Sequence, residues 1–208
     1  TSLSVFTKWT DFYTKYGFLK TYDFFNRFRL GLMPMSIQSY TMYATLTAAA
    51  PEIDGLWQMY EVPGTIGEDG KINNSISGGG SGAVILSTSK HKKEAWEFLK
   101  WWTGADIQFR YGSEVEKILG PSARNATSNV EALKKYEWSY NNLETLLSQW
   151  SKVKEIPEVP GGYYVSRAID QAFWNVTNAS ENPKDMLLKW TDVAQNEIDR
   201  KRQQYNIK

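Results

Sequence analysis

The sequence of 208 residues contains no cysteine and a single histidine, His91. Without cysteine, disulfides and thiolate metal sites are excluded. A catalytic triad or a histidine-containing zinc site would have to use His91. That residue lies in the basic run 89–93, where we expect it to be a solvated residue at the start of a helix.

Charge of one sign and long apolar runs are also missing. Lys and Arg together number 24 and Asp and Glu 23, which leaves a net charge of +1. This balance gives no electrostatic reason to expect a nucleic acid partner. No apolar run reaches the roughly 18 residues that a membrane-spanning helix needs. Hydrophobic residues still make up 41% of the chain, which is enough for a packed core.

Aromatic residues are abundant, with nine Trp, twelve Tyr and nine Phe. Such rings serve either as ordinary packing or as stacking platforms for a flat-faced ligand, and composition leaves both open. Because sugar rings present apolar C–H faces, the aromatic excess suits a carbohydrate.

The hydrophobic spacing predicts a helix-rich chain with a few short strands, which is an α/β class. Extended segments are expected at 28–37 and 56–62, and the apolar run 83–86 has the pattern of a buried strand. Turn residues at 65–74 predict a hairpin or a surface loop. Helices are expected at 5–16, 38–50, 92–103, 106–119, 129–135, 143–150, 165–176 and 183–205.

The glycine-rich segment 78–82 is the first candidate site, with Gly79, Gly80 and Ser81 as its candidate ligand-binding residues. Glycines let backbone N–H groups approach a ligand closely. The segment lacks the Lys-Ser/Thr ending of a P-loop and leads into a strand pattern, so a nucleotide site is not indicated. The alternative is a flexible linker or a tight turn.

Tyr163 and Tyr164 form the second candidate, together with Arg167 one turn further on. Neighbouring residues point in different directions around a helix, so at least one of the tyrosines is expected to be exposed. Arg167 would either hydrogen-bond a hydroxyl-rich ligand or hold a tyrosine in place. Ordinary surface residues are the alternative.

Ser39 and Tyr40 form the third candidate, because they follow the expected extended stretch and precede a helix. A strand end that leads into a helix often lines a ligand crevice in open α/β sheets. Alternatively, Ser39 caps the helix and Tyr40 packs on the core.

Several segments, in this order, resemble the family of extracellular solute-binding proteins typified by maltodextrin-binding protein. The resemblance lies in 28–37, which follows an F-x-x-G-x-x-x-M pattern, in Pro63-Gly64 with 78–82, in Ser89-Lys90 before Ala95-Trp96-Glu97-Phe98-Leu99, and in 156–167 with the C-terminal helix. It implies the C-terminal portion of a two-lobed, type II periplasmic-binding-protein fold. Residues 1–62 and 121–208 would belong to the second lobe, and 63–120 to the hinge and a segment that packs with a first lobe lying before Thr1.

The same resemblance implies an extracellular or periplasmic binding component of an ABC importer, anchored as a lipoprotein. It would take a small solute, favoured to be a sugar, deliver it to a membrane permease, and use no metal, cofactor or catalysis. Tyr163 and Tyr164 match cleft aromatics that stack on sugar rings, and Arg167 matches a nearby polar position. Ser39 and Tyr40 match a segment where the family often places a tryptophan, and the glycine loop matches a segment that faces the cleft.

Two other function classes stay open, a carbohydrate-active hydrolase and a helical protein-interaction module. The hydrolase would need two carboxylates facing one cleft, whereas the binding hypothesis needs the two tyrosines and the glycines in one groove. If the first lobe is missing, the run 83–86 and the helix with Trp96, Trp101 and Trp102 lack their partner. We therefore expect repacking, or exchange between copies of the chain.

Overall fold

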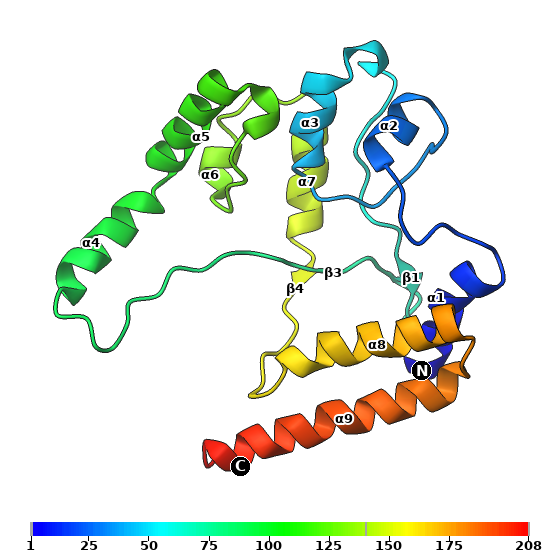
Figure 1. Cartoon of the computed structure of the whole chain (residues 1–208). Coiled ribbons are helices and arrows are strands. Elements are labelled where there is room, and N and C mark those ends of the chain that lie inside the picture. Colours follow the sequence, from blue (N-terminus) through cyan, green and yellow to red (C-terminus); the bar gives the residue numbers. More distant parts are fainter. Residues whose placement is uncertain (1, 140, 208) are drawn as a thin grey trace. The chain divides into compact units, whose positions relative to one another are not determined.

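The computed structural model describes residues 2–139 and 141–207 and divides into two compact units (Figure 1). The first unit combines Thr1–Tyr22 with Ile156–Lys208, and the second is the continuous segment Asp23–Glu155. The lobe division expected above concerns packing against a further lobe, so it stays a prediction.

The first unit consists of helices whose apolar faces pack together, namely α1 (Ser2–Thr14), α8 (Tyr163–Ala179) and α9 (Pro183–Gln204). Phe173 lies at the centre of its core, where Trp9 stacks on it with ring centroids 4.4 Å apart and Tyr13 meets it edge-on at 5.0 Å. The side chain of Asn182 accepts hydrogen bonds from the first backbone N–H groups of α9. Asn182 thus caps α9, and Pro183 follows at the first helical position, where its missing N–H costs no hydrogen bond.

The turn before α8 depends on a glycine. Gly161 has a φ of +85°, and a Cβ added to it would lie 2.9 Å from the Cα of Ile198 on α9. Only glycine allows both the left-handed backbone and this close approach. The start of α8 is therefore held directly against α9.

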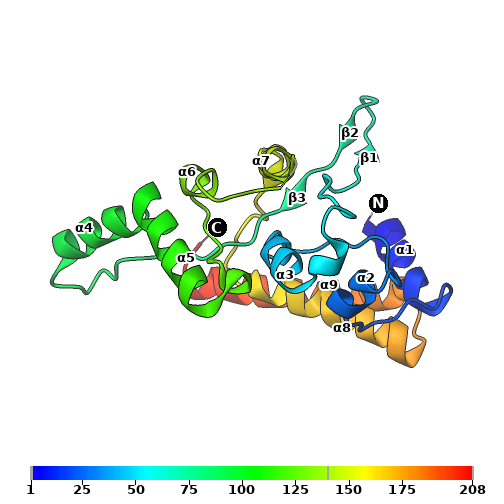
Figure 2. The same cartoon turned by 90° about the horizontal axis from the view of Figure 1, so that it is seen from above.

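The second unit is also mostly helical, and its strands are two residues long. Its helical segments are α2 (Phe24–Arg29), α3 (Met42–Ala49), η1 (Pro51–Ile53), α4 (Lys92–Trp102), α5 (Ala105–Leu119), η2 (Pro121–Ala123), α6 (Val130–Leu133) and α7 (Asn142–Trp150). Strands β1 (Thr65–Ile66) and β2 (Ile72–Asn73) form the predicted antiparallel hairpin, which is clear in Figure 2. Strands β3 (Ile76–Ser77) and β4 (Val153–Lys154) pair in parallel.

The core of the second unit lies where α3, α5, α6 and η2 meet. Tyr43, Leu46, Leu133 and Tyr136 are buried there. Gly112 on α5 has no side chain at the point where the Tyr136 hydroxyl packs, and a Cβ would lie 1.9 Å from that oxygen. The helices predicted from periodicity are confirmed here, including α4, with His91 exposed at its N-cap.

Three segments that the sequence pattern predicts to be extended or strand-like form no strand in the structure. Segment 28–37 begins inside α2 and is irregular beyond it. Segment 56–62 forms no ladder, because side chains of α7 take two of its backbone N–H groups: Asn142 accepts from Met59 and Gln149 accepts from Val62, at 2.9 and 2.7 Å.

The expected buried strand at 83–86 was wrong. This run lies in the segment without regular structure that connects β3 to α4 (Figure 1). Val84 is 84% exposed and Leu86 68%. No neighbouring strand within the described residues offers a ladder to this run, so its apolar pattern alone could not bury it.

Candidate functional site

The two tyrosines at the start of α8 form an aromatic corner with opposite environments. Tyr163 is 61% exposed, whereas Tyr164 is partly buried. Their rings meet edge-on with centroids 5.4 Å apart. The Arg167 guanidinium lies over the Tyr164 ring at 5.7 Å from its centroid. One tyrosine is thus exposed, as helical geometry predicts, and Arg167 packs on the other. A ligand role for these three residues stays a prediction.

Glu197 on α9 fixes the exposed ring. The Tyr163 hydroxyl donates to its carboxylate at 2.5 Å, and Arg200 donates to the same carboxylate from two nitrogens at 2.7 Å. The bond to Glu197 raises the pKa of the Tyr163 hydroxyl. Arg200 and Tyr163 together lower the pKa of the Glu197 carboxyl to about 2. Tyr163 is therefore an exposed but oriented ring, which is what a stacking platform requires.

Ser39 and Tyr40 precede α3 and lie in different environments. Ser39 is exposed and accepts a hydrogen bond from Thr41, but the N-cap of α3 is Thr41. The Tyr40 hydroxyl donates to the carbonyl of Thr127 at 3.2 Å, and its ring meets Trp150 edge-on. Burial raises the pKa of Tyr40 to about 12. Tyr40 thus packs on the core, which is the alternative stated above.

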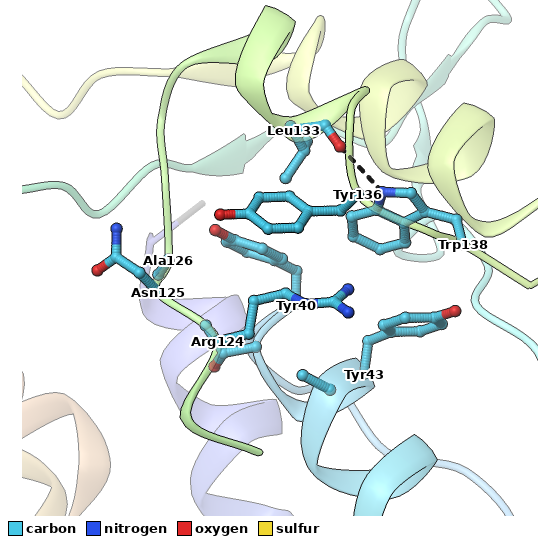
Figure 3. Close-up of a pocket in the computed structure, with 10 residues that line it drawn as sticks. Tyr40, Tyr43, Arg124, Asn125, Ala126, Leu133, Tyr136 and Trp138 are labelled. Atoms are coloured by element: carbon cyan, nitrogen blue, oxygen red, sulfur yellow. Dashed lines mark hydrogen bonds between the residues drawn. The ribbon is translucent and has the colours of Figure 1, made fainter. Parts of the chain in front are cut away.

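Tyr40 also lines a small cavity in the second unit, where Figure 3 shows it with Tyr43, Tyr136 and Arg124. Arg124 donates to both carboxylate oxygens of Glu116 at 2.9 Å, and its guanidinium lies 4.9 Å from the Tyr136 ring centroid. The cavity volume is about 10 Å³, at the lower limit for one water molecule. This cavity is therefore too small for a sugar ring.

The glycine candidates lie on the segment between β3 and α4. Gly79, Gly80 and Ser81 are exposed, and a Cβ built on either glycine would meet no atom within 4 Å. Within residues 2–139 and 141–207, therefore, no packing contact requires glycine at 79 or 80. Their exposure leaves the backbone accessible, but their role as a ligand loop stays a prediction.

The structure thus gathers Tyr163, Tyr164 and Arg167 at one place in the first unit. The remaining predicted residues, Ser39, Tyr40, Gly79, Gly80 and Ser81, belong to the second unit. A groove shared between the two sets stays a prediction. Sequence reasoning missed Glu197, because the Tyr163–Glu197 bond spans 34 positions and follows only from the packing of α8 on α9.

Part of the chain matches a known protein family. Residues 21–109 match the family model of the bacterial extracellular solute-binding protein. The match covers less than half of the 208 residues. It supports extracellular solute binding and includes Ser39, Tyr40 and the glycine segment, whereas the α8 corner lies outside it. A comparison with curated proteins found no match.

Among residues 2–139 and 141–207, no group of three or more His, Asp or Glu side chains is placed to hold a metal ion. The helices within the same ranges are too short or too polar to cross a membrane.

Proposed function

We propose that the chain is the solute-binding component of an ABC importer and that its solute is a carbohydrate. The observation that carries the proposal is the Tyr163 ring, which is exposed and yet held by Glu197. The family match over residues 21–109 supports solute binding outside the cell. The ligand, the delivery to a permease and a lipoprotein anchor are parts of the proposal.

The chemistry of the α8 corner supports a sugar over a charged solute. An oriented aromatic face stacks on the apolar side of a pyranose ring, and the Arg167 donors suit its hydroxyl groups. Aromatic side chains with a few placed polar groups are the usual composition of small-molecule sites. A two-lobed fold and a ligand role for the exposed glycine segment 78–82 are further parts of the proposal.

The proposal is tested by a thermal-shift screen of the full chain with glycans and peptides. A solute at about 100 times its Kd adds about 2.7 kcal/mol to the free energy of unfolding and raises the midpoint. We expect shifts with glycans, loss of these shifts in Tyr163→Ala, and retention in Tyr205→Ala. Tyr205 is a suitable control because it is also an exposed tyrosine of the first unit, at the end of α9.

Three outcomes would contradict the proposal. Shifts with peptides alone would favour a protein-interaction module. Turnover of a labelled oligosaccharide by the purified chain would favour a hydrolase. Glycan shifts that survive in Tyr163→Ala would remove the α8 corner from the site.

A further inference from the structure

The face of α8 that carries Tyr163 continues along the helix. Tyr163, Arg167, Asp170 and Trp174 follow one another at intervals of four, three and four residues, so they share one side of a helix with 3.6 residues per turn. All four are exposed, whereas Ala168, Ala172 and Val176 are buried against the rest of the unit. The row spans about 16 Å at a rise of 1.5 Å per residue.

Trp174 closes the row with a second aromatic ring. Its indole is 42% exposed and meets the core residue Phe173 edge-on at 5.3 Å. Lys20 lies 5.9 Å from the indole centroid, donates to the carbonyl of Thr177 at 2.8 Å and bonds the Asn178 side chain. The contacts with Phe173 and Lys20 hold the indole in place and leave part of it accessible. Trp174 is therefore, like Tyr163, an exposed ring that neighbouring side chains hold.

The two charged residues between the rings are available to a ligand. Among the ion pairs of the described ranges, none includes Arg167 or Asp170. Arg167 offers several N–H donors and Asp170 offers carboxylate acceptors, a combination that satisfies sugar hydroxyls in both directions. If the ligand were instead an apolar surface of a partner protein, both charges would be covered without hydrogen-bond partners.

We infer that this row is an extended binding face for a linear oligosaccharide, with a subsite at Asp170 and Trp174 beyond the one at Tyr163. The inference rests on the proposed function and names the solute class more narrowly. Ring faces at the two ends and opposite charges between them complement a chain of several sugar units better than a single sugar. Affinity should therefore rise with chain length until the Trp174 end is reached.

The test uses the full chain and two linear series of probes, from glucose to maltotetraose and from glucose to cellotetraose. Calorimetry should give at least one series in which Trp174→Phe and Asp170→Asn weaken binding of the tri- and tetrasaccharide about five- to tenfold. Binding of the shortest members should change less than about twofold. Tyr163→Ala should weaken every member of that series.

A second measurement observes ligand binding in the wild-type chain and uses a variant only to assign one signal. In ¹⁵N-labelled wild-type chain, the indole N–H signal of Trp174 is assigned by its absence from Trp174→Phe. We expect this signal to move on titration with the tetrasaccharide and to stay in place with glucose. The signal of Trp96, which is 56% exposed on α4, serves as the control.

The failures of the two proposals differ in these measurements. If Tyr163→Ala loses binding while Trp174→Phe binds long and short sugars like the wild type, the extended face is wrong and the proposed function stands. A Trp174 signal that never moves while the tetrasaccharide binds leads to the same conclusion. If the wild-type chain binds no member of either series, the extended face is wrong, whereas the proposed function fails only when the wider glycan screen also gives no shift.

Discussion

Glu61, in the irregular segment before the β1–β2 hairpin, shows how much a single side chain is constrained in this protein. Its carboxylate accepts hydrogen bonds from Lys152, Ser148 and Asn74. Lys152, assisted by Ser148, lowers the pKa of Glu61 from its ordinary 4.5 to about 2. The carboxylate therefore joins the end of α7 to the residues around the hairpin.

This pKa predicts a specific dependence of stability on pH. Because the folded-state pKa lies below the ordinary value, Glu61 stabilises the fold above about pH 4.5 and loses this contribution as the pH falls toward 2. We expect Glu61→Gln to flatten the decline of the urea midpoint between these two pH values. Glu68→Gln, which removes a carboxylate that makes none of these bonds, should leave the decline as in the wild type. Equal slopes for Glu61→Gln and the wild type would contradict the assignment.

At the scale of elements, α7 stabilises an irregular segment through its side-chain amides. Asn142 and Gln149 are seven residues apart, about two helical turns, and both are buried. They accept from the backbone N–H groups of Met59 and Val62, and Gln149 also donates to the carbonyl of Asn74. These bonds replace the strand ladder that the sequence pattern predicted for 56–62.

Removing either amide should destabilise this connection. Asn142→Leu or Gln149→Leu leaves a backbone N–H without its partner, at a cost of about 1–3 kcal/mol in the free energy of unfolding. Urea unfolding measures the loss, and amide hydrogen exchange should accelerate at Met59 or Val62 respectively. Asn141→Ala is the matched control, because Asn141 is exposed and makes no side-chain cap bond. Unchanged exchange at both amides would show that the bonds do not hold the segment.

At the scale of the whole molecule, the surface from the run 83–86 to the end of α4 exposes several large apolar side chains. Besides Val84 and Leu86, Trp96, Phe98 and Trp101 are each more than half exposed. Apolar surface of this kind commonly marks an interaction site. The resemblance led us to expect exchange or association between copies of the chain. We therefore predict that this surface mediates it.

Light scattering coupled to size-exclusion chromatography tests this prediction. We expect the mean mass to rise above the 23.9 kDa of one chain as the concentration increases. Trp96→Lys with Trp101→Lys should lower the mass toward that of the monomer. Leu188→Lys, at an equally exposed leucine on α9, should not. A monodisperse monomer over the whole concentration range would refute the association.

Local patterns were sufficient to predict much of this fold. The helices α1, α4, α5, α8 and α9 follow from apolar residues at helical spacing. The start of α9 follows from Asn182 and Pro183, and the β1–β2 hairpin from its turn residues. The exposure of one of two adjacent tyrosines followed from helical geometry alone. The spacing of Tyr163, Arg167, Asp170 and Trp174 could also have been read from the sequence.

Only the tertiary structure decided which side chains act together. The sequence pattern of an apolar strand is the same whether a ladder is available or not, so 83–86 and 56–62 were predicted as strands. Tyr40 and Tyr163 are both tyrosines beside a helix start, yet Tyr40 is half-buried against Trp150 and Tyr163 is held at the surface by Glu197. Periodicity within one helix sets the direction of a side chain, but its burial and its partners depend on segments distant in the chain. The physical reason is that burial and hydrogen bonding are properties of pairs of elements.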